Sequence, residues 1–180
     1  MVKILISEFI NKNSLNKLKG VFKVHYDETL WKNPKKIIKI INDFDCLIVR
    51  NKTIVDKNLL HEAYKIKLVG RLGVGLDNID TKYCHTKKIH VQPATGMNAD
   101  SVAEYVGTCS LFLIKKISLF HKKTLEGKWP RTIISSEELK GKNLGIIGFG
   151  SVGKKVSEYC LKFGLRVIVY DKYLKKFKRK

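Results

Sequence analysis

A glycine-rich segment between two apolar runs constrains the fold of this chain more than any other feature. Residues 143–147 form a short apolar run that is typical of a buried strand. The run leads into Gly148-Phe-Gly150-Ser-Val-Gly153, after which apolar side chains recur at helical spacing. A second apolar run, residues 167–170, ends in Asp171. A strand, a glycine turn, a helix, a strand and an acid in this order predict a dinucleotide-binding unit.

The three glycines have separate roles in such a unit. Gly148 permits a tight turn, Gly150 lets the main chain approach a pyrophosphate, and Gly153 lets the helix pack closely on the strand. The pyrophosphate lies on unpaired N–H groups at the helix N-terminus. Asp171 then accepts hydrogen bonds from the adenosine ribose, and its charge favours NAD over NADP. A glycine-rich turn in an unrelated α/β protein is the alternative interpretation.

The composition allows a packed core. Hydrophobic residues make up 44% of the 180 residues, which argues against disorder. No apolar run is long enough to span a bilayer, and the N-terminus becomes polar too early for a signal peptide. We therefore expect a cytoplasmic protein without membrane contacts.

The chain carries a large positive charge, which has two interpretations. Lys and Arg outnumber Asp and Glu by 36 to 16, a net charge of +20, and this favours non-specific attraction to nucleic acid. However, the basic residues are spread along the chain, and only the tail, residues 172–180, carries them densely. No helix-turn-helix, zinc or stacking-aromatic pattern accompanies them. We interpret most of them as solvated surface and expect no specific nucleic-acid partner.

The cysteines do not have the spacing of metal ligands. They are Cys46, Cys84, Cys109 and Cys160. We expect reduced, buried thiols and no metal site.

The first hundred residues alternate between short strands and helices. The expected strands are residues 3–7, 21–26, 46–49, 67–71 and 89–92. This alternation predicts a parallel sheet that helices cover on both faces. Ligands of such sheets bind at the carboxyl ends of the strands. These ends carry Arg50-Asn51, a turn at residues 73–75 and residues 93–98, so we expect them to meet on one rim and bind a small molecule.

A helix is expected to connect this sheet to the glycine-rich segment. Ser101-x-x-Glu104 has the pattern of a capping box at its start. Its predicted buried stripe is Ala103, Val106, Ser110, Leu113 and Ile117. The polar residues 121–142 are expected to form a loop. The chain thus divides into a sheet domain at residues 1–99 and the first part of a nucleotide-binding domain at residues 100–180.

Three segments of the chain resemble the D-isomer-specific 2-hydroxyacid dehydrogenases, and most closely their 3-phosphoglycerate dehydrogenase-like branch. The segments are residues 70–80, 98–104 and 138–153. The resemblance implies an α/β fold with a flavodoxin-like substrate domain, followed by a Rossmann domain that stops here after its second strand. It also implies hydride transfer between NAD and a 2-hydroxy/2-oxo acid at a cleft between the domains, in a protein that is usually a homodimer.

The strand ends and the resemblance together give the expected site residues. Those expected to bind the substrate are Arg50, Asn51, Arg71, Val74, Gly75 and Asn98. Those expected to bind the cofactor are Val74, Gly148, Gly150, Ser151, Val152, Gly153 and Asp171. Main-chain amides of a glycine turn suit a carboxylate, and arginine suits a carboxylate or a phosphate. The alternatives are surface cations for Arg50 and Arg71 and a helix cap for Asn98.

No catalytic residue is expected within this chain. The family supplies an arginine, a glutamate and a histidine for substrate polarisation and proton transfer, and their positions are expected beyond Lys180. The five histidines of this chain match none of these positions. We therefore expect a fragment, a truncated product or half of a split enzyme that is inactive alone, with the missing half possible as a separate chain. A non-catalytic, NAD-responsive binding or regulatory fragment is the alternative function.

Overall fold

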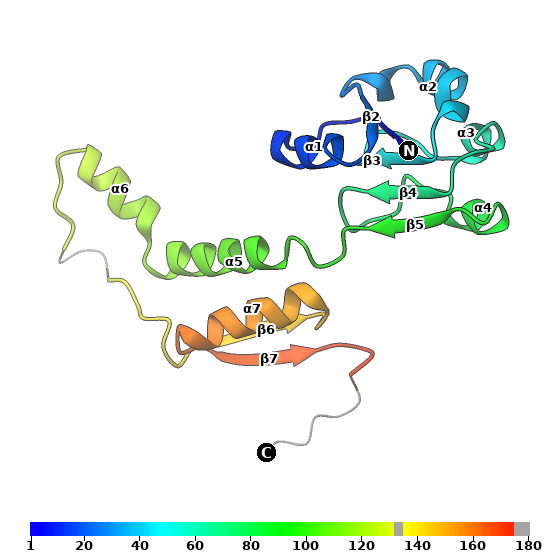
Figure 1. Ribbon diagram of the computed structural model, residues 1–180. Helices are drawn as coiled ribbons and strands as arrows, with labels where there is room; N and C mark the ends of the chain where they lie inside the picture. Colours follow the sequence, from blue (N-terminus) through cyan, green and yellow to red (C-terminus); the bar gives the residue numbers. More distant parts are fainter. Residues whose placement is uncertain (132–134, 175–180) are drawn as a thin grey trace. The chain divides into compact units, whose positions relative to one another are not determined.

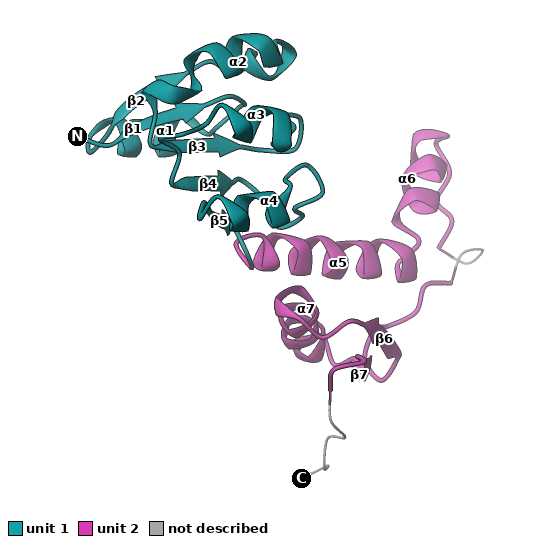
Figure 2. Cartoon of the chain, turned by 90° about the vertical axis from the view of Figure 1, so that its right-hand side faces the viewer, with its two compact units in different colours: residues 1–95 teal, residues 96–180 magenta. Residues whose placement is uncertain are grey.

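The computed structural model describes residues 1–131 and 135–174 (Figure 1). Most of the predicted basic tail, residues 175–180, lies outside the described residues. The chain forms two compact units, Met1–Thr95 and Gly96–Lys180, which are coloured separately in Figure 2. The boundary between them lies four residues before the one expected after residue 99.

Unit 1 is built on a parallel sheet of five strands. The strands are β1 (Lys3–Ile6), β2 (Lys23–Tyr26), β3 (Cys46–Val49), β4 (Leu68–Arg71) and β5 (His90–Pro93). Their order in the sheet is β2-β1-β3-β4-β5, and every neighbouring pair is parallel. This is the order of the flavodoxin-like doubly wound fold. The predicted α/β class and sheet type are confirmed.

Short helices connect these strands. They are α1 (Lys12–Lys19), α2 (Pro34–Ile40), α3 (Lys57–His61) and α4 (Thr81–Thr86), with 3₁₀ turns η1 (Leu30–Lys32) and η2 (Ile41–Asp43). Side chains cap the first turn of α2, α3 and α4. Asn33, Asp56 and Asp80 are the N-caps of α2, α3 and α4, and each side chain accepts a hydrogen bond from a main-chain N–H of the first turn.

The two faces of the sheet carry separate apolar clusters. Successive side chains of a strand point to opposite faces. Leu5 and Leu47 therefore join the cluster that includes α2, α3 and α4, whereas Ile4, Ile6 and Cys46 join a smaller one with α1. Helices thus cover both faces, and the carboxyl ends of the strands remain as the open rim.

Unit 2 places a long helix against a strand–helix–strand motif. Its elements are α5 (Ala99–Ile114), α6 (Ile117–Leu125), β6 (Asn143–Ile147), α7 (Ser151–Lys162) and β7 (Arg166–Tyr170). The strands β6 and β7 are parallel, and α5 packs against α7. Ala103 of α5 shares a small core with Val156 and Cys160 of α7. On the opposite face of the two strands Ile147 is 89% exposed, and Ile168 and Tyr170 are also exposed.

Three predictions for this unit are wrong. The helix α5 begins at Ala99, so Ser101 and Glu104 lie inside it and form no capping box. The helix α6 continues to Leu125, so the expected loop starts later than residue 121.

The buried stripe of α5 also differs from the predicted one. It consists of Ala99, Ala103 and Gly107, whereas Leu113 is 72% exposed. Small residues are buried because α7 and its end approach closely: a Cβ on Gly107 would lie 3.2 Å from the Phe163 ring. The apolar residues of α5 surround the whole helix, so their periodicity did not reveal the face that packs.

Replacing a buried isoleucine of unit 1 should cost far more stability than replacing an exposed one. Ile37 of α2 is fully buried in the larger cluster, whereas Ile54 is 59% exposed. We expect Ile37→Ala to lower the free energy of unfolding by about 2–5 kcal/mol. The matched control Ile54→Ala should change it by about 0.5 kcal/mol or less. Urea unfolding of both variants measures the difference, and equal losses would contradict the assigned core.

Candidate functional site

The glycine turn after β6 exposes main chain at the start of α7. Gly148 has a φ of +93°, a left-handed conformation that side chains rarely adopt, and Gly150 is the N-cap of α7. A Cβ added to either glycine would meet no atom within 4 Å. The first helical hydrogen bond runs from Lys154 N–H to the Gly150 carbonyl, so the amides of Ser151, Val152 and Gly153 precede the helical ladder. The turn therefore offers an open cradle for an anion.

The third glycine is where the helix and the turn touch. A Cβ on Gly153 would lie 2.2 Å from the carbonyl oxygen of Gly148 and 3.4 Å from a methyl group of Ile146. No side chain fits into this contact. Gly153 is therefore required by packing, whereas Gly148 is required by its main-chain conformation and Gly150 by neither.

Asp171 is directed at the glycine turn. Its Oδ2 accepts a hydrogen bond from the main-chain N–H of Phe149 at 2.6 Å, and its Oδ1 accepts one from Tyr173 N–H at 2.8 Å. These two hydrogen bonds, the one from Phe149 being the stronger, lower the pKa of the carboxyl group. An ionised acid thus sits beside the cradle, at the carboxyl end of β7.

Two hollows adjoin the turn. One of about 510 Å³ is lined by Gly148, Gly150 and Ser151 together with the apolar side of β6 and α7. The other, of about 350 Å³, lies between Gly148 and the segment from Tyr170 to Tyr173. The turn and Asp171 border open space rather than packed side chains.

In unit 1 the carboxyl ends of β3, β4 and β5 lie side by side. Val49 is in register with Arg71, and Arg71 with Pro93. The main-chain N–H of Ala94 donates to the carbonyls of Arg71 and Gly73 at 3.1 and 3.0 Å. The residues that follow these strands therefore meet on one rim, as the sequence predicted.

Arg71 folds over the turn at residues 73–75. A Cβ on Gly73 would lie 1.5 Å from Nη1 of Arg71, so the guanidinium occupies the space that a side chain would need. A Cβ on Gly75 would lie 3.9 Å from Nη2 of the same group and 2.9 Å from the Asp77 carboxylate. The Nε of Arg71 is buried without a hydrogen-bond partner among the described residues. Val74, at the tip of the turn, is half exposed.

Arg50 and Asn51 open the turn that follows β3, and a buried glutamate organises this turn. Glu8, two residues after β1, is 3% exposed. Its Oε1 accepts hydrogen bonds from the main-chain N–H groups of Arg50 at 2.8 Å and Thr53 at 2.9 Å. Its Oε2 accepts those of Asn51 at 3.2 Å and Lys52 at 3.0 Å. Sequence reasoning missed Glu8, although an acid directly after a buried strand was the available signal.

Further polar groups brace the same turn. The Asn78 side-chain amide donates to the carbonyls of Thr53 at 2.8 Å and Arg50 at 3.3 Å. The hydroxyls of Ser7 and Thr53 are 2.8 Å apart. Burial alone would raise the pKa of Glu8, but the hydrogen bonds from Thr53, Arg50 and Lys52 outweigh it and lower the pKa. The carboxylate is therefore ionised at neutral pH.

Asn98 belongs to unit 2, whereas the other residues expected to bind the substrate belong to unit 1. It is exposed and occupies the N-cap position of α5, but its side chain makes no capping hydrogen bond. Gly96, which precedes Asn98 by two residues, lies near the side chain of Ser151. A Cβ added to Gly96 would be 3.6 Å from the Cβ of Ser151.

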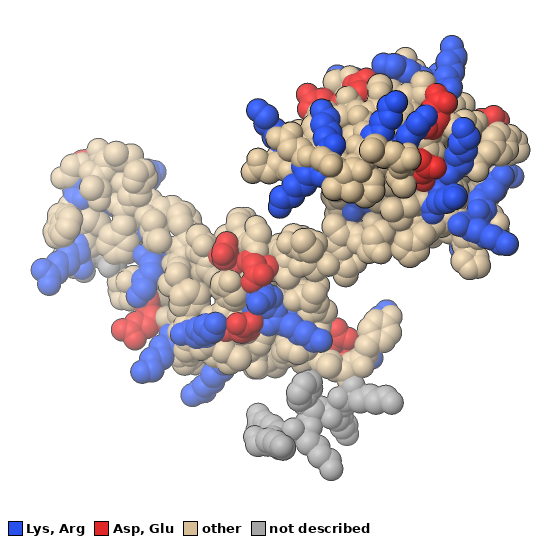
Figure 3. Space-filling model, in the orientation of Figure 1, with Lys and Arg blue, Asp and Glu red and all other residues tan. Residues whose placement is uncertain are grey.

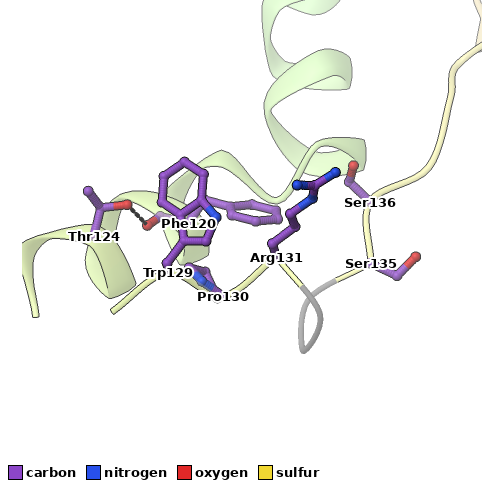
Figure 4. Close-up of a pocket in the computed structure, with 7 residues that line it drawn as sticks. All are labelled: Phe120, Thr124, Trp129, Pro130, Arg131, Ser135 and Ser136. Carbon is purple, nitrogen blue, oxygen red and sulfur yellow. Dashed lines mark hydrogen bonds between the residues drawn. The ribbon is translucent and has the colours of Figure 1, made fainter. Parts of the chain in front are cut away.

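A third hollow, of about 380 Å³, lies at α6 and the segment after it (Figure 4). Its lining residues are Phe120, Thr124, Trp129, Pro130, Arg131, Ser135 and Ser136. Figure 4 shows the Thr124 hydroxyl donating to the Phe120 carbonyl, at 3.0 Å. Arg131 is its only charged lining residue, so among the described residues this hollow lacks the converging polar groups of the two sites above.

The cysteines and the other possible metal ligands form no further site among the described residues. All four cysteines are free; Cys46, Cys84 and Cys160 are buried, but Cys109 is only half-buried, in contrast to the expectation. Burial raises the pKa of the Cys46 and Cys84 thiols to about 11.

Within residues 1–131 and 135–174 no group of acids, histidines and cysteines could hold a metal ion. In the same residues every helix is too short or too polar to cross a bilayer. Figure 3 shows Lys and Arg scattered over both units on the visible face.

Residues 4–170 match the family described as D-isomer specific 2-hydroxyacid dehydrogenase, catalytic domain. The (S)-sulfolactate dehydrogenase of Chromohalobacter salexigens is 37% identical over 174 residues, which are 97% of this chain and 56% of that protein. The D-3-phosphoglycerate dehydrogenase of Methanocaldococcus jannaschii is 35% identical over 176 residues, 98% of this chain and 33% of that protein. The chain therefore spans about half or less of the length of these relatives.

A solved structure has the same fold. The NAD⁺-bound 3-phosphoglycerate dehydrogenase of Entamoeba histolytica superposes with a TM-score of 0.71 at 28% identity, over 97% of this chain and 55% of that one.

The contact at Gly153 predicts a large difference between two glycine-to-alanine substitutions. Gly153→Ala places a Cβ against the Gly148 carbonyl, so the helix must move away from the turn, and we expect about 2–4 kcal/mol lower stability. Gly145→Ala in β6 is the matched control, because its Cβ would meet nothing within 4 Å. Thermal unfolding compares them, and an equally stable Gly153→Ala variant would refute the contact.

The hydrogen bonds to Glu8 predict an unusual titration. Because the pKa of Glu8 in the folded protein is lowered from 4.5, its stabilising effect is present above the unfolded pKa and is lost as pH falls through the folded pKa. We expect the side-chain carboxyl carbon of Glu8 to titrate below pH 4.5 in carbon-13 NMR. In Glu8→Gln the corresponding part of the acid loss of stability should disappear. Titration at or above the ordinary glutamate range would contradict the network.

Proposed function

This chain belongs to the D-isomer specific 2-hydroxyacid dehydrogenase family, and we propose that it forms the substrate- and NAD-binding part of such an oxidoreductase. Unit 1 binds the 2-hydroxy or 2-oxo acid and unit 2 binds the dinucleotide. The observation that carries the proposal is the open glycine turn after β6, with an ionised Asp171 hydrogen-bonded to it.

NAD is the dinucleotide that fits unit 2. The cradle at Gly148 and Gly150 has room for a pyrophosphate, and the amides of Ser151, Val152 and Gly153 supply donors at the positive end of the α7 dipole. Asp171 beside the turn accepts hydrogen bonds from ribose hydroxyls and repels a 2′-phosphate. The bound cofactor supplies a nicotinamide ring that takes or gives a hydride.

An acid with a second, anionic group is the substrate class that fits unit 1. The main chain at Val74-Gly75 suits the substrate carboxylate, and Val74 contacts the cofactor side of the substrate. Arg50 and Arg71 place two guanidinium groups near adjacent strand ends for a phosphate or a sulfonate. Relatives named for sulfolactate and 3-phosphoglycerate are consistent with either tail. Asn51 and Asn98 are proposed as further polar contacts of the substrate.

We assign the proton-transfer groups of the reaction to none of the residues that the structure describes. The chain spans about half of its relatives, and the two strands of unit 2 leave an apolar face around Ile147 and Ile168. A dinucleotide-binding fold has two βαβαβ halves, and β6, α7 and β7 make only the beginning of one. We propose that a segment outside these 180 residues, in the same or a separate polypeptide, covers this face and carries the catalytic arginine, glutamate and histidine.

The glycine turn gives a direct test of cofactor binding. We expect NADH to bind the 180-residue chain, with a rise in nicotinamide fluorescence, and NADPH to bind at least about tenfold more weakly because of Asp171. Gly150→Val should lose the affinity for NADH, since its side chain fills the cradle and each lost charge-assisted hydrogen bond is worth about 1.5–3 kcal/mol. Its melting temperature should stay near wild type, because a Cβ at this position meets nothing within 4 Å.

Reduction of 2-oxo acids tests the enzyme itself. NADH oxidation is measured for the chain alone and for the chain joined to, or mixed with, a C-terminal segment of a relative. We expect turnover only with the segment. A chain that binds neither NADH nor NAD⁺ in any of these forms would refute the proposed function.

A further inference from the structure

We propose that Glu8 is a positioning residue for the anion-binding rim of unit 1. It holds in place the turn that carries Arg50 and Asn51. It also occupies the main-chain amides of that turn, so that the substrate cannot bind to them. The inference rests on the proposed function, because it concerns the site at which the acid substrate is expected to bind. It adds a buried residue, behind the exposed side chains of the rim, to those that determine how the anion is recognised.

The carboxylate of Glu8 takes up every main-chain donor of the turn at residues 50–53. The four N–H groups lie 2.8–3.2 Å from its two oxygens, two on each oxygen. Successive N–H groups that converge in this way form a nest, which in many proteins binds a phosphate or another free anion. Here the protein's own side chain fills the nest and is itself 3% exposed. A substrate anion therefore cannot use these amides.

The anion is left to the side chains that project from the rim. The Arg50 side chain is exposed, and neither Arg50 nor Arg71 forms an ion pair with an acid in the part of the chain that the structure describes. The buried Nε of Arg71 also lacks a protein partner there. Two guanidinium groups on adjacent strand ends thus remain available for a tail of two or more oxygens.

The network joins the ends of three strands. Glu8 follows β1, the turn follows β3, and Asn78, beyond β4, donates to carbonyls at both ends of the turn. The four N–H donors of the turn and the carbonyls at its two ends therefore have partners, which holds its main chain in one conformation. The side chain of Arg50 is attached to this main chain. A looser turn would therefore let the Arg50 guanidinium occupy a wider range of positions, which weakens its pairing with the anionic tail of the substrate.

The test compares anion binding with the geometry of the turn in the full 180-residue chain. Wild type, Glu8→Gln, Glu8→Asp and the control Glu62→Gln, outside the network, are titrated with sulfolactate by calorimetry at pH 7. The sulfonate does not titrate near this pH. In parallel, nitrogen-15 NMR records the amide signals of residues 50–53, and the remaining signals report whether each variant is folded.

We expect Glu8→Gln to bind sulfolactate about tenfold more weakly. This is the usual loss of affinity when a residue that supports a ligand-binding residue is replaced. The variant's amide protons at residues 50–53 should move upfield, because one carboxylate oxygen is replaced by an NH₂ group that cannot accept. Glu8→Asp keeps the charge and should recover part of the affinity, and Glu62→Gln should bind like wild type. A variant of Glu8 that is folded and has shifted amide signals, yet binds like wild type, would overturn the inference.

The outcomes also separate this inference from the proposed function. Wild-type chain that binds neither sulfolactate nor 3-phosphoglycerate would overturn both. Wild-type binding that is unaffected by Glu8→Gln overturns only the positioning role. If Glu8→Gln does not fold, Glu8→Asp decides: affinity equal to wild type, with altered amide signals, overturns the positioning role, and weaker binding supports it.

Discussion

The close contact between α7 and the Gly148 carbonyl is the constraint on which unit 2 depends. With no side chain at Gly153, the helix starts directly at the end of β6, and its first amides face the space beside the turn. Any other residue at this position would push the helix away and tilt those amides. The same contact therefore sets both the packing of α7 and the position of the amides that we propose to bind an anion.

The two units use main-chain amides in opposite ways. In unit 2 the amides at the start of α7 lie beside open space and are available to a ligand. In unit 1 the amides of the turn after β3 are occupied by Glu8. We propose that unit 2 recognises the pyrophosphate of a dinucleotide through main chain, whereas unit 1 recognises the acid substrate mainly through guanidinium groups at strand ends. Main chain suits a ligand shared by many enzymes, and side chains suit one that differs among them.

Several features of the fold and the site were predictable because their signals are local. The N-caps Asn33, Asp56 and Asp80 each act on a helix that begins at the next residue, and the glycine turn lies within six consecutive residues. The parallel sheet also follows from the alternation of strands and helices, whereas its flavodoxin-like order was implied by the family resemblance. The start of α5 and its buried face were not predictable, because α7 determines which side of an evenly apolar helix is covered.

The sequence by itself determined the alternation of strands and helices, the family and the place of the glycine turn, because each depends on neighbouring residues or on a motif. Only the tertiary structure revealed that the Glu8 carboxylate accepts hydrogen bonds from the main chain of Arg50 and Asn51, which are more than forty residues away in the chain. It also placed the Arg71 guanidinium over Gly73 and left its Nε without a protein partner among the described residues. Hydrogen bonds between distant strand ends arise only when parallel pairing brings those ends to the same edge, and no local pattern in the chain encodes which donor meets which acceptor.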